Sequence, residues 1–164
     1  MMNILVLYDL FEFRSRNTII EHLKSFERYS KHKVYYYNVA FGVQPWVENA
    51  SFDLIVYHYT ICGLKWSRPE QSLFSPDMQR LAKIKGYKIA VPQDEYVHNN
   101  HLCKFFKEQG ISSIFTCFFE EDYAKAYPVE LTGITHIETV YPGYLDERAL
   151  SKLGTKVKSH HERK

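Results

Sequence analysis

Two adjacent carboxylates and a histidine lie in one short segment, VPQDEYVHNN at residues 91–100, which follows directly on an apolar run. A carboxylate can accept the proton of a ligand hydroxyl group, while aromatic rings and imidazoles can orient a polar, ring-shaped ligand. Asp94 and Glu95 are therefore the candidate catalytic residues. Because neighbouring side chains point in different directions in extended chain, we expect only Asp94 to act as the base. The alternative is that either carboxylate does no more than cap the helix predicted at 97–109.

Side chains of similar types follow the other predicted strands and form a candidate substrate-binding set. Asp9 ends the first apolar run, and His58 and Tyr59 end the third. Arg14 and Arg16 precede a predicted helix N-terminus, where anions are favoured, although they are equally compatible with a solvated loop. The predicted substrate-binding residues are Asp9, Arg14, Arg16, His58, Tyr59, Tyr96 and His98.

The same loops argue against a cofactor and against a metal. The segment after the first apolar run, DLFEFRSRN at 9–17, contains no glycine, so it lacks the G-x-G-x-x-G that a dinucleotide site needs. The phosphate-binding motif G-x-x-x-x-G-K-[ST] is absent, and the third strand ends in aromatic residues rather than in the carboxylate of a phosphoacceptor site. His98 and His101 are one helical turn apart, but no third ligand accompanies them. The sequence therefore predicts neither a cofactor nor a metal site.

These loops are positioned by six apolar runs that alternate with helical patterns. Continuous apolar strands alternating with helices are typical of a parallel sheet covered on both faces. We expect an α/β, Rossmann-like doubly wound sheet, mainly parallel, with strand order 3-2-1-4-5-6. In that order the loops after the first and fourth strands, at 9–16 and 93–100, face each other across a crevice. The predicted strands are 3–8, 33–39, 53–59, 87–92, 112–118 and 136–143.

Local signals place the ends of two helices. Thr18 and Glu21 have the spacing of a capping box, which predicts a helix starting there. Ser75 is the expected N-cap of a second helix, and Gly86 is its expected stop. The segment at 44–48 is expected to form one short helical turn at most.

Composition limits the class of protein. The chain has 164 residues, enough for one domain, which we place at 1–148 and follow with a basic linker or tail at 149–164. A net charge of +2 gives no field to recruit nucleic acid. Three widely spaced cysteines and the lack of any apolar run of about 18 residues predict a cytoplasmic protein with no transmembrane segment.

The order NILVLYD, FDLIVYHY, KIAVPQDEY and TVYPGY resembles the amino-terminal half of bacterial group 1 glycosyltransferases with the two-domain GT-B fold. The likeness covers about residues 3–148, and PQDEY and PGY are its most particular parts. In such enzymes the amino-terminal domain usually holds the acceptor, and the carboxyl-terminal domain binds most of the nucleotide-sugar donor. The resemblance implies that Asp94 or Glu95 provides a base or an acceptor contact and that the loop at 10–17 faces the donor phosphates.

The resemblance also implies an activity, namely transfer of a sugar from a nucleotide-sugar donor to a glycan or another hydroxyl acceptor. In the family a second domain begins where this chain ends, so we expect the domain alone to be inactive and to need a C-terminal domain or a partner chain. Two alternatives remain. One is a free-standing Rossmann-like binding or interaction module without catalysis, and the other is a small enzyme acting on a phosphorylated or nucleotide substrate at Asp9, Asp94 and His98.

Overall fold

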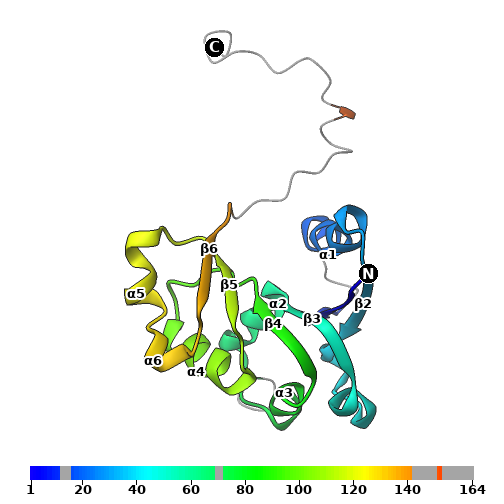
Figure 1. Ribbon diagram of the computed structural model, residues 1–164, viewed down its shortest axis with the longest axis horizontal. Helices are drawn as coiled ribbons and strands as arrows, with labels where there is room; N and C mark the ends of the chain where they lie inside the picture. Colours follow the sequence, from blue (N-terminus) through cyan, green and yellow to red (C-terminus); the bar gives the residue numbers. More distant parts are fainter. Residues whose placement is uncertain (12–15, 69–71, 142–150, 153–164) are drawn as a thin grey trace.

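In the computed structural model of this chain, which describes residues 1–11, 16–68, 72–141 and 151–152, six parallel strands form a single sheet. The strand order is β2-β1-β3-β4-β5-β6 (Figure 1). The α/β, Rossmann-like class is thereby confirmed. The strands are β1 (Asn3–Tyr8), β2 (Lys33–Asn38), β3 (Ser51–Tyr57), β4 (Lys85–Ala90), β5 (Ser113–Thr116) and β6 (His136–Thr139).

Helices and short helical turns connect the strands. Figure 1 shows α1 at the β2 end of the sheet and α5 and α6 beside β6. The helices are α1 (Asn17–Tyr29), α2 (Tyr59–Cys62), α3 (Pro76–Leu81), α4 (Asn99–Gln109), α5 (Tyr123–Ala126) and α6 (Val129–Thr132). The 3-10 turns are η2 (Val39–Phe41), η3 (Pro45–Asn49), η4 (Gly63–Trp66) and η6 (Glu120–Asp122).

The strand order differs from the predicted 3-2-1-4-5-6, and that prediction is wrong. Leu7 of β1 pairs with Tyr37 of β2 on one side and with Tyr57 of β3 on the other, while Tyr57 also pairs with Ala90 of β4. The loops after β1 and β4 therefore do not adjoin, because β3 separates them by two strand spacings, about 10 Å in all. In this order the switch point, where a parallel sheet forms its crevice, lies between β1 and β3.

The position of β2 at the edge follows from its composition. Its sequence, KVYYYN, begins and ends in a polar residue and contains one aliphatic residue, and Tyr35 and Tyr36 remain partly exposed. The chain leaves β2 through η2 and η3, which bury Val39 and Val47 in the larger core as they cross to β3. The more apolar strand β3 thus takes the interior place beside β1.

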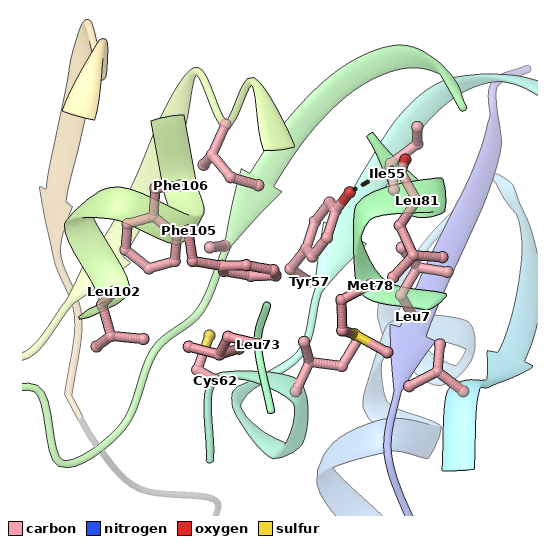
Figure 2. Close-up of a cluster of buried hydrophobic side chains, with 14 of the residues drawn as sticks. Leu7, Ile55, Tyr57, Cys62, Leu73, Met78, Leu81, Leu102, Phe105 and Phe106 are labelled. Atoms are coloured by element: carbon pink, nitrogen blue, oxygen red, sulfur yellow. Dashed lines mark hydrogen bonds between the residues drawn. The ribbon is translucent and has the colours of Figure 1, made fainter. Parts of the chain in front are cut away.

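Two cores form on the two faces of the sheet because strand residues alternate in direction. In β1, Leu5 and Leu7 belong to the larger core, whereas Ile4 and Val6 belong to the smaller one. Helices α2 to α4 pack on the larger core, where Figure 2 shows side chains from α3 and α4 meeting those of β1 and β3. On the other face, α1 buries Leu23 against β1 and β3.

A polar network lies inside the larger core. The Tyr57 hydroxyl donates to Gln109 Oε1 at 3.0 Å, and the Gln109 side-chain amide donates to the Met78 carbonyl at 2.9 Å. The Lys88 ammonium donates to the carbonyls of Ala82 (2.6 Å) and Gln109 (3.0 Å), and burial lowers the Lys88 pKa to about 8. The network satisfies carbonyls near the ends of α3 and α4, where a cation is also favoured by the helix dipole.

The helix ends correct two predictions and confirm one. Helix α1 has Arg16 as its N-cap with no side-chain cap bond, and Glu21 is paired with Arg28 at 2.8 Å, so the predicted capping box is wrong. Ser75 does cap α3 by accepting a hydrogen bond from the Met78 amide. Helix α3 ends at Leu81, however, so the glycine expected to stop it lies instead in β4.

That glycine, Gly86, is required by its backbone conformation. Its φ is +149°, and a Cβ atom there would lie 2.4 Å from the Phe52 carbonyl oxygen. We expect Gly86→Ala to lower the free energy of unfolding by at least about 2 kcal/mol, as measured by urea denaturation. Gly63→Ala is the matched control, since nothing lies within 4 Å of its added methyl group, and it should change stability by less than about 0.5 kcal/mol. Equal effects of the two substitutions would contradict this account.

Candidate ligand-binding cleft

A cleft of about 600 Å³ lies between α1 and the β4–β5 part of the sheet, on the face of the smaller core. We call it the α1 cleft. The lining residues come from α1, from β4, β5 and the residues that follow them, from the residues that follow β6, and from Tyr59. Among the described residues, its lining contains no Asp, Glu, Lys or Arg. The lining residues are Thr18, His22, Ser25, Phe26, Tyr59, Ile89, Val91, Pro92, Gln93, Phe115, Cys117, Val140 and Tyr141.

Two histidines join the wall of the cleft to the switch point of the sheet. Nδ1 of His22, on α1, lies 2.8 Å from Nε2 of His58, the first residue after β3. The His58 ring is fully buried, and the Tyr59 ring packs on it at a centroid distance of 3.9 Å. The pair therefore links a half-buried ring in the cleft to a ring inside the protein.

The hydrogen-bond partners of His58 assign the proton positions on both rings. The Thr60 backbone N–H, which can only donate, is 3.3 Å from Nδ1 of His58, and the Thr60 hydroxyl is 2.9 Å from the same atom. Nδ1 of His58 is thus an acceptor, and its proton is on Nε2. That Nε2–H donates to Nδ1 of His22. His22 therefore carries its own proton on Nε2.

Both histidines are neutral at neutral pH. Burial, together with the charge that His22 would carry, lowers the pKa of His58 to about 2. Burial also lowers the pKa of His22. Neither ring supplies a positive charge to the cleft.

Asp9 lies on the other side of the switch point. Its backbone amide donates to the Thr60 hydroxyl at 3.0 Å, and burial raises the pKa of its carboxyl group. Asp9 lines a second cleft of about 450 Å³, together with Phe11, Ser67 and Asp77. Within the described residues, the lining of this second cleft contains two carboxylates and no lysine or arginine.

The loop after β4 is held in an unusual conformation. Asp94 and His98 both have positive φ angles, of 53° and 51°, which are uncommon for residues other than glycine. The ammonium group of buried Lys65 donates to the carbonyls of Gln93 (3.2 Å) and Asp94 (2.6 Å). Burial lowers the Lys65 pKa, and the nearby Asp94 and Glu95 oppose that shift. Lys65 thus fixes the backbone of the loop while the Asp94 side chain stays exposed.

The Glu95 side chain is buried in the protein, whereas that of Asp94 is exposed. Glu95 is 3% exposed, and its carboxylate accepts hydrogen bonds from the Thr116 hydroxyl, the Cys117 backbone amide (2.9 Å) and the Tyr127 hydroxyl. It therefore joins the β4 loop to the end of β5 and to the residue after α5. Helix α4 begins at Asn99 with His98 as its N-cap, so the alternative in which Asp94 or Glu95 caps that helix is wrong.

The remaining predicted site residues are scattered. Arg16 is exposed at the start of α1, and Arg14 lies outside the described residues. Tyr96 is 77% exposed. The His98 ring meets Trp66 edge-on at 4.8 Å, away from the α1 cleft. Among the described residues, the structure thus places Tyr59 in the lining of the cleft with buried His58 stacked against it, whereas Arg16, Tyr96 and His98 do not line the cleft.

The predicted set omitted His22, Thr60 and Lys65. The one signal for His22 in the sequence was its position four residues before Phe26, which places the two on one side of α1. Its contact with His58 could be expected only once β1 and β3 were known to be neighbours. Lys65 gave no signal, since it binds main-chain carbonyls rather than a charged partner.

Among the residues that the structure describes, no three His, Cys, Asp or Glu side chains are grouped so as to hold a metal ion. In the same residues, no helix combines the length and apolar character needed to cross a membrane. Comparisons of the chain with protein-family models, with curated proteins and with solved structures gave no significant match.

Proposed function

We propose that this domain is the acceptor-binding half of a cytoplasmic glycosyltransferase, which moves a sugar from a nucleotide-sugar donor to a glycan or another hydroxyl acceptor. The observation that carries the proposal is the α1 cleft at the carboxyl edge of a parallel sheet, beside the PQDEY segment. Its rings and uncharged polar groups suit a neutral saccharide, which packs on aromatic faces and exchanges hydrogen bonds with imidazole, amide and hydroxyl groups.

The donor is assigned to a different surface. A nucleotide-sugar carries a diphosphate, which proteins usually hold with cationic side chains or with several backbone amides at a helix N-terminus. Within the described residues neither cleft is lined by lysine or arginine, and the second cleft contains Asp9 and Asp77. We therefore assign the donor to another domain or to a partner chain.

Asp94 is the proposed base. Its neighbour Gln93 lines the α1 cleft, and its own carboxylate is exposed on the same loop. In this role Asp94 accepts the proton of the acceptor hydroxyl as that oxygen bonds to the sugar carbon of the donor. The bond between that carbon and the phosphate oxygen breaks, and the nucleotide leaves with the electron pair. Glu95, buried and hydrogen-bonded to three donors, is assigned to holding the loop, as is Lys65.

A glycan-binding measurement tests the proposal. The labelled chain is applied to an array of neutral and acidic oligosaccharides, and hits are mapped by two-dimensional NMR. Neutral saccharides are expected to perturb Tyr59, Phe115 and His22, whereas nucleotide-sugars are expected to leave these signals unchanged. Absence of any saccharide binding would refute the proposal. Saccharide binding without transfer, when every candidate donor and partner domain is supplied, would favour the binding-module alternative.

Asp94→Asn distinguishes a role of Asp94 as the base from a role in saccharide binding. Asparagine tolerates positive φ angles, so the substitution removes the charge and leaves the loop conformation in place. With the donor-binding domain or partner chain supplied, we expect kcat/KM for sugar transfer to fall at least about 100-fold, with saccharide affinity within about threefold and stability within about 0.5 kcal/mol of the original protein. Glu121→Gln, on exposed η6, is the control and should change none of the three. Full activity of Asp94→Asn would rule out its role as base.

A further inference from the structure

We infer that His22 is the specificity-determining residue of the α1 cleft, a neutral N–H donor of fixed orientation that selects an uncharged oxygen of the ligand over a carboxylate. The inference deepens the proposed function and rests on it for the identity of the ligand as an acceptor. The selection of a neutral group follows from the hydrogen bonds of the two histidines and can be tested separately.

The Thr60 backbone amide fixes the proton position on His58, and His58 in turn fixes that on His22. The Thr60 amide cannot reverse its hydrogen bond, so Nδ1 of His58 stays an acceptor and Nε2 of His58 stays a donor. This donor meets Nδ1 of His22 at 2.8 Å. Because His22 lines the cleft and its Nδ1 is occupied, Nε2–H is the group left for a bound molecule.

The same chain of bonds keeps His22 uncharged when a ligand binds. To become a cation, His22 would need a proton on Nδ1, where it would face the Nε2–H of His58 and the bond between the rings would be lost. His58 cannot relieve this conflict by changing tautomer, since the Thr60 amide would then face a second N–H. An anionic ligand at His22 therefore meets a neutral donor and, among the described lining residues, no compensating positive charge.

No other group in the described lining supplies that charge. The remaining titratable side chains of the cleft are the phenols of Tyr59 and Tyr141 and the thiol of Cys117. Burial raises the pKa of Tyr59 and of Cys117, which keeps both groups neutral at pH 7. A carboxylate entering the cleft would thus lose water without gaining an ion pair, and desolvation of an unpaired charge is costly.

Nuclear magnetic resonance tests the proton positions directly. Two-bond couplings between ring protons and ¹⁵N nuclei distinguish the two neutral tautomers from each other and from the cation. At pH 7 we expect both His22 and His58 to be protonated on Nε2 alone. Exposed His136 serves as the internal comparison. A His22 ring that is protonated on Nδ1, or that is cationic at pH 7, would overturn the inference.

Two matched pairs of probes test the selection. Cyclohexanecarboxamide and cyclohexanecarboxylate share a shape and differ in charge, as do methyl β-glucoside and methyl β-glucuronoside. In each pair we expect the neutral probe to bind at least about tenfold more tightly at pH 7 and to shift the His22 signals. Equal binding within the cyclohexane pair would overturn the inference. If the cyclohexane pair shows the preference and neither glycoside binds, the inference about His22 stands and the proposed function fails. If none of the four probes binds, the inference and the proposed function both fail.

Two variants separate the role of His22 from that of its neighbour. His22→Phe removes the donor and should weaken binding of the carboxamide by about tenfold, whereas His136→Gln, outside the lining, should leave it unchanged. His58→Leu removes the Nε2–H that occupies Nδ1 of His22, which leaves Nδ1 free to take a proton and allows His22 to become a cation. At pH 6 this variant should reduce the preference for the carboxamide to less than about threefold. A preference that stays tenfold in the folded His58→Leu protein would show that the bond between the rings does not cause it.

Discussion

Replacing Glu95 with alanine is expected to lower the free energy of unfolding by about 3–5 kcal/mol, the largest effect that we predict for a single substitution. The change leaves the Thr116 hydroxyl, the Cys117 amide and the Tyr127 hydroxyl without their common acceptor, and Thr116 and Tyr127 are buried. It also opens a cavity where the loop after β4 meets β5. Denaturation in guanidinium chloride measures the loss, with Glu121→Ala on exposed η6 as the control.

Glu95→Gln distinguishes a structural role of this carboxylate from a catalytic one. Glutamine keeps one acceptor oxygen for the hydroxyl groups but presents an amide to the remaining donor, so a smaller loss of about 1–3 kcal/mol is expected. If Glu95→Gln were as stable as the original protein and yet inactive in sugar transfer, Glu95 rather than Asp94 would be the base. Loss of stability with kcat/KM retained in the folded fraction would assign Glu95 to the framework.

Acid is expected to destabilise the protein through the two histidines. The folded-state pKa of His58 is about 2, whereas an unfolded histidine titrates near 6.5, so the unfolded state binds more protons below pH 6.5. The stability contributed by the neutral ring is present above pH 6.5 and is lost as pH falls. For His58 alone this amounts to about 2 kcal/mol between pH 7 and pH 5, and the lowered pKa of His22 adds to it in the same direction.

Denaturation curves recorded at several pH values between 5 and 7 measure this effect. Asp9 acts in the opposite direction, because burial raises the pKa of its carboxyl group and the folded state then binds the extra proton. The double variant His22→Phe, His58→Leu should show a flatter dependence of stability on pH, whereas His136→Gln, at an exposed site on β6, should retain the original dependence. An unchanged slope in the double variant would contradict the assignment.

Much of the fold could be predicted from the sequence, because each strand is a local apolar run bounded by polar residues. The order of the strands could not, since hydrophobicity reports that a strand is buried and does not name its neighbours. A weak signal was nevertheless present. The run at 33–38 contains Lys33 and Asn38 and only one aliphatic residue, which suits an edge strand, while the run at 53–57 contains three aliphatic residues and suits an interior position.

The candidate site was predictable to the extent that it lies at strand ends. His58 and Tyr59 were identified because they follow an apolar run, and both lie at the switch point. His22 comes from a helix and reaches the site only through tertiary packing, so no local pattern marks it. The different roles of Asp94 and Glu95 depend on the positive φ at Asp94, a backbone conformation that the sequence does not specify for aspartate.

The order of the strands also determines when each strand can acquire its partners during translation. Strand β1 is synthesised first, yet the register that pairs Leu7 with Tyr57 brings its second neighbour fifty residues later. Until then the apolar run at 3–8 has only β2 as a partner, and two strands alone are marginally stable in water. The nascent chain up to β3 thus carries an incompletely paired apolar strand, a feature that favours aggregation.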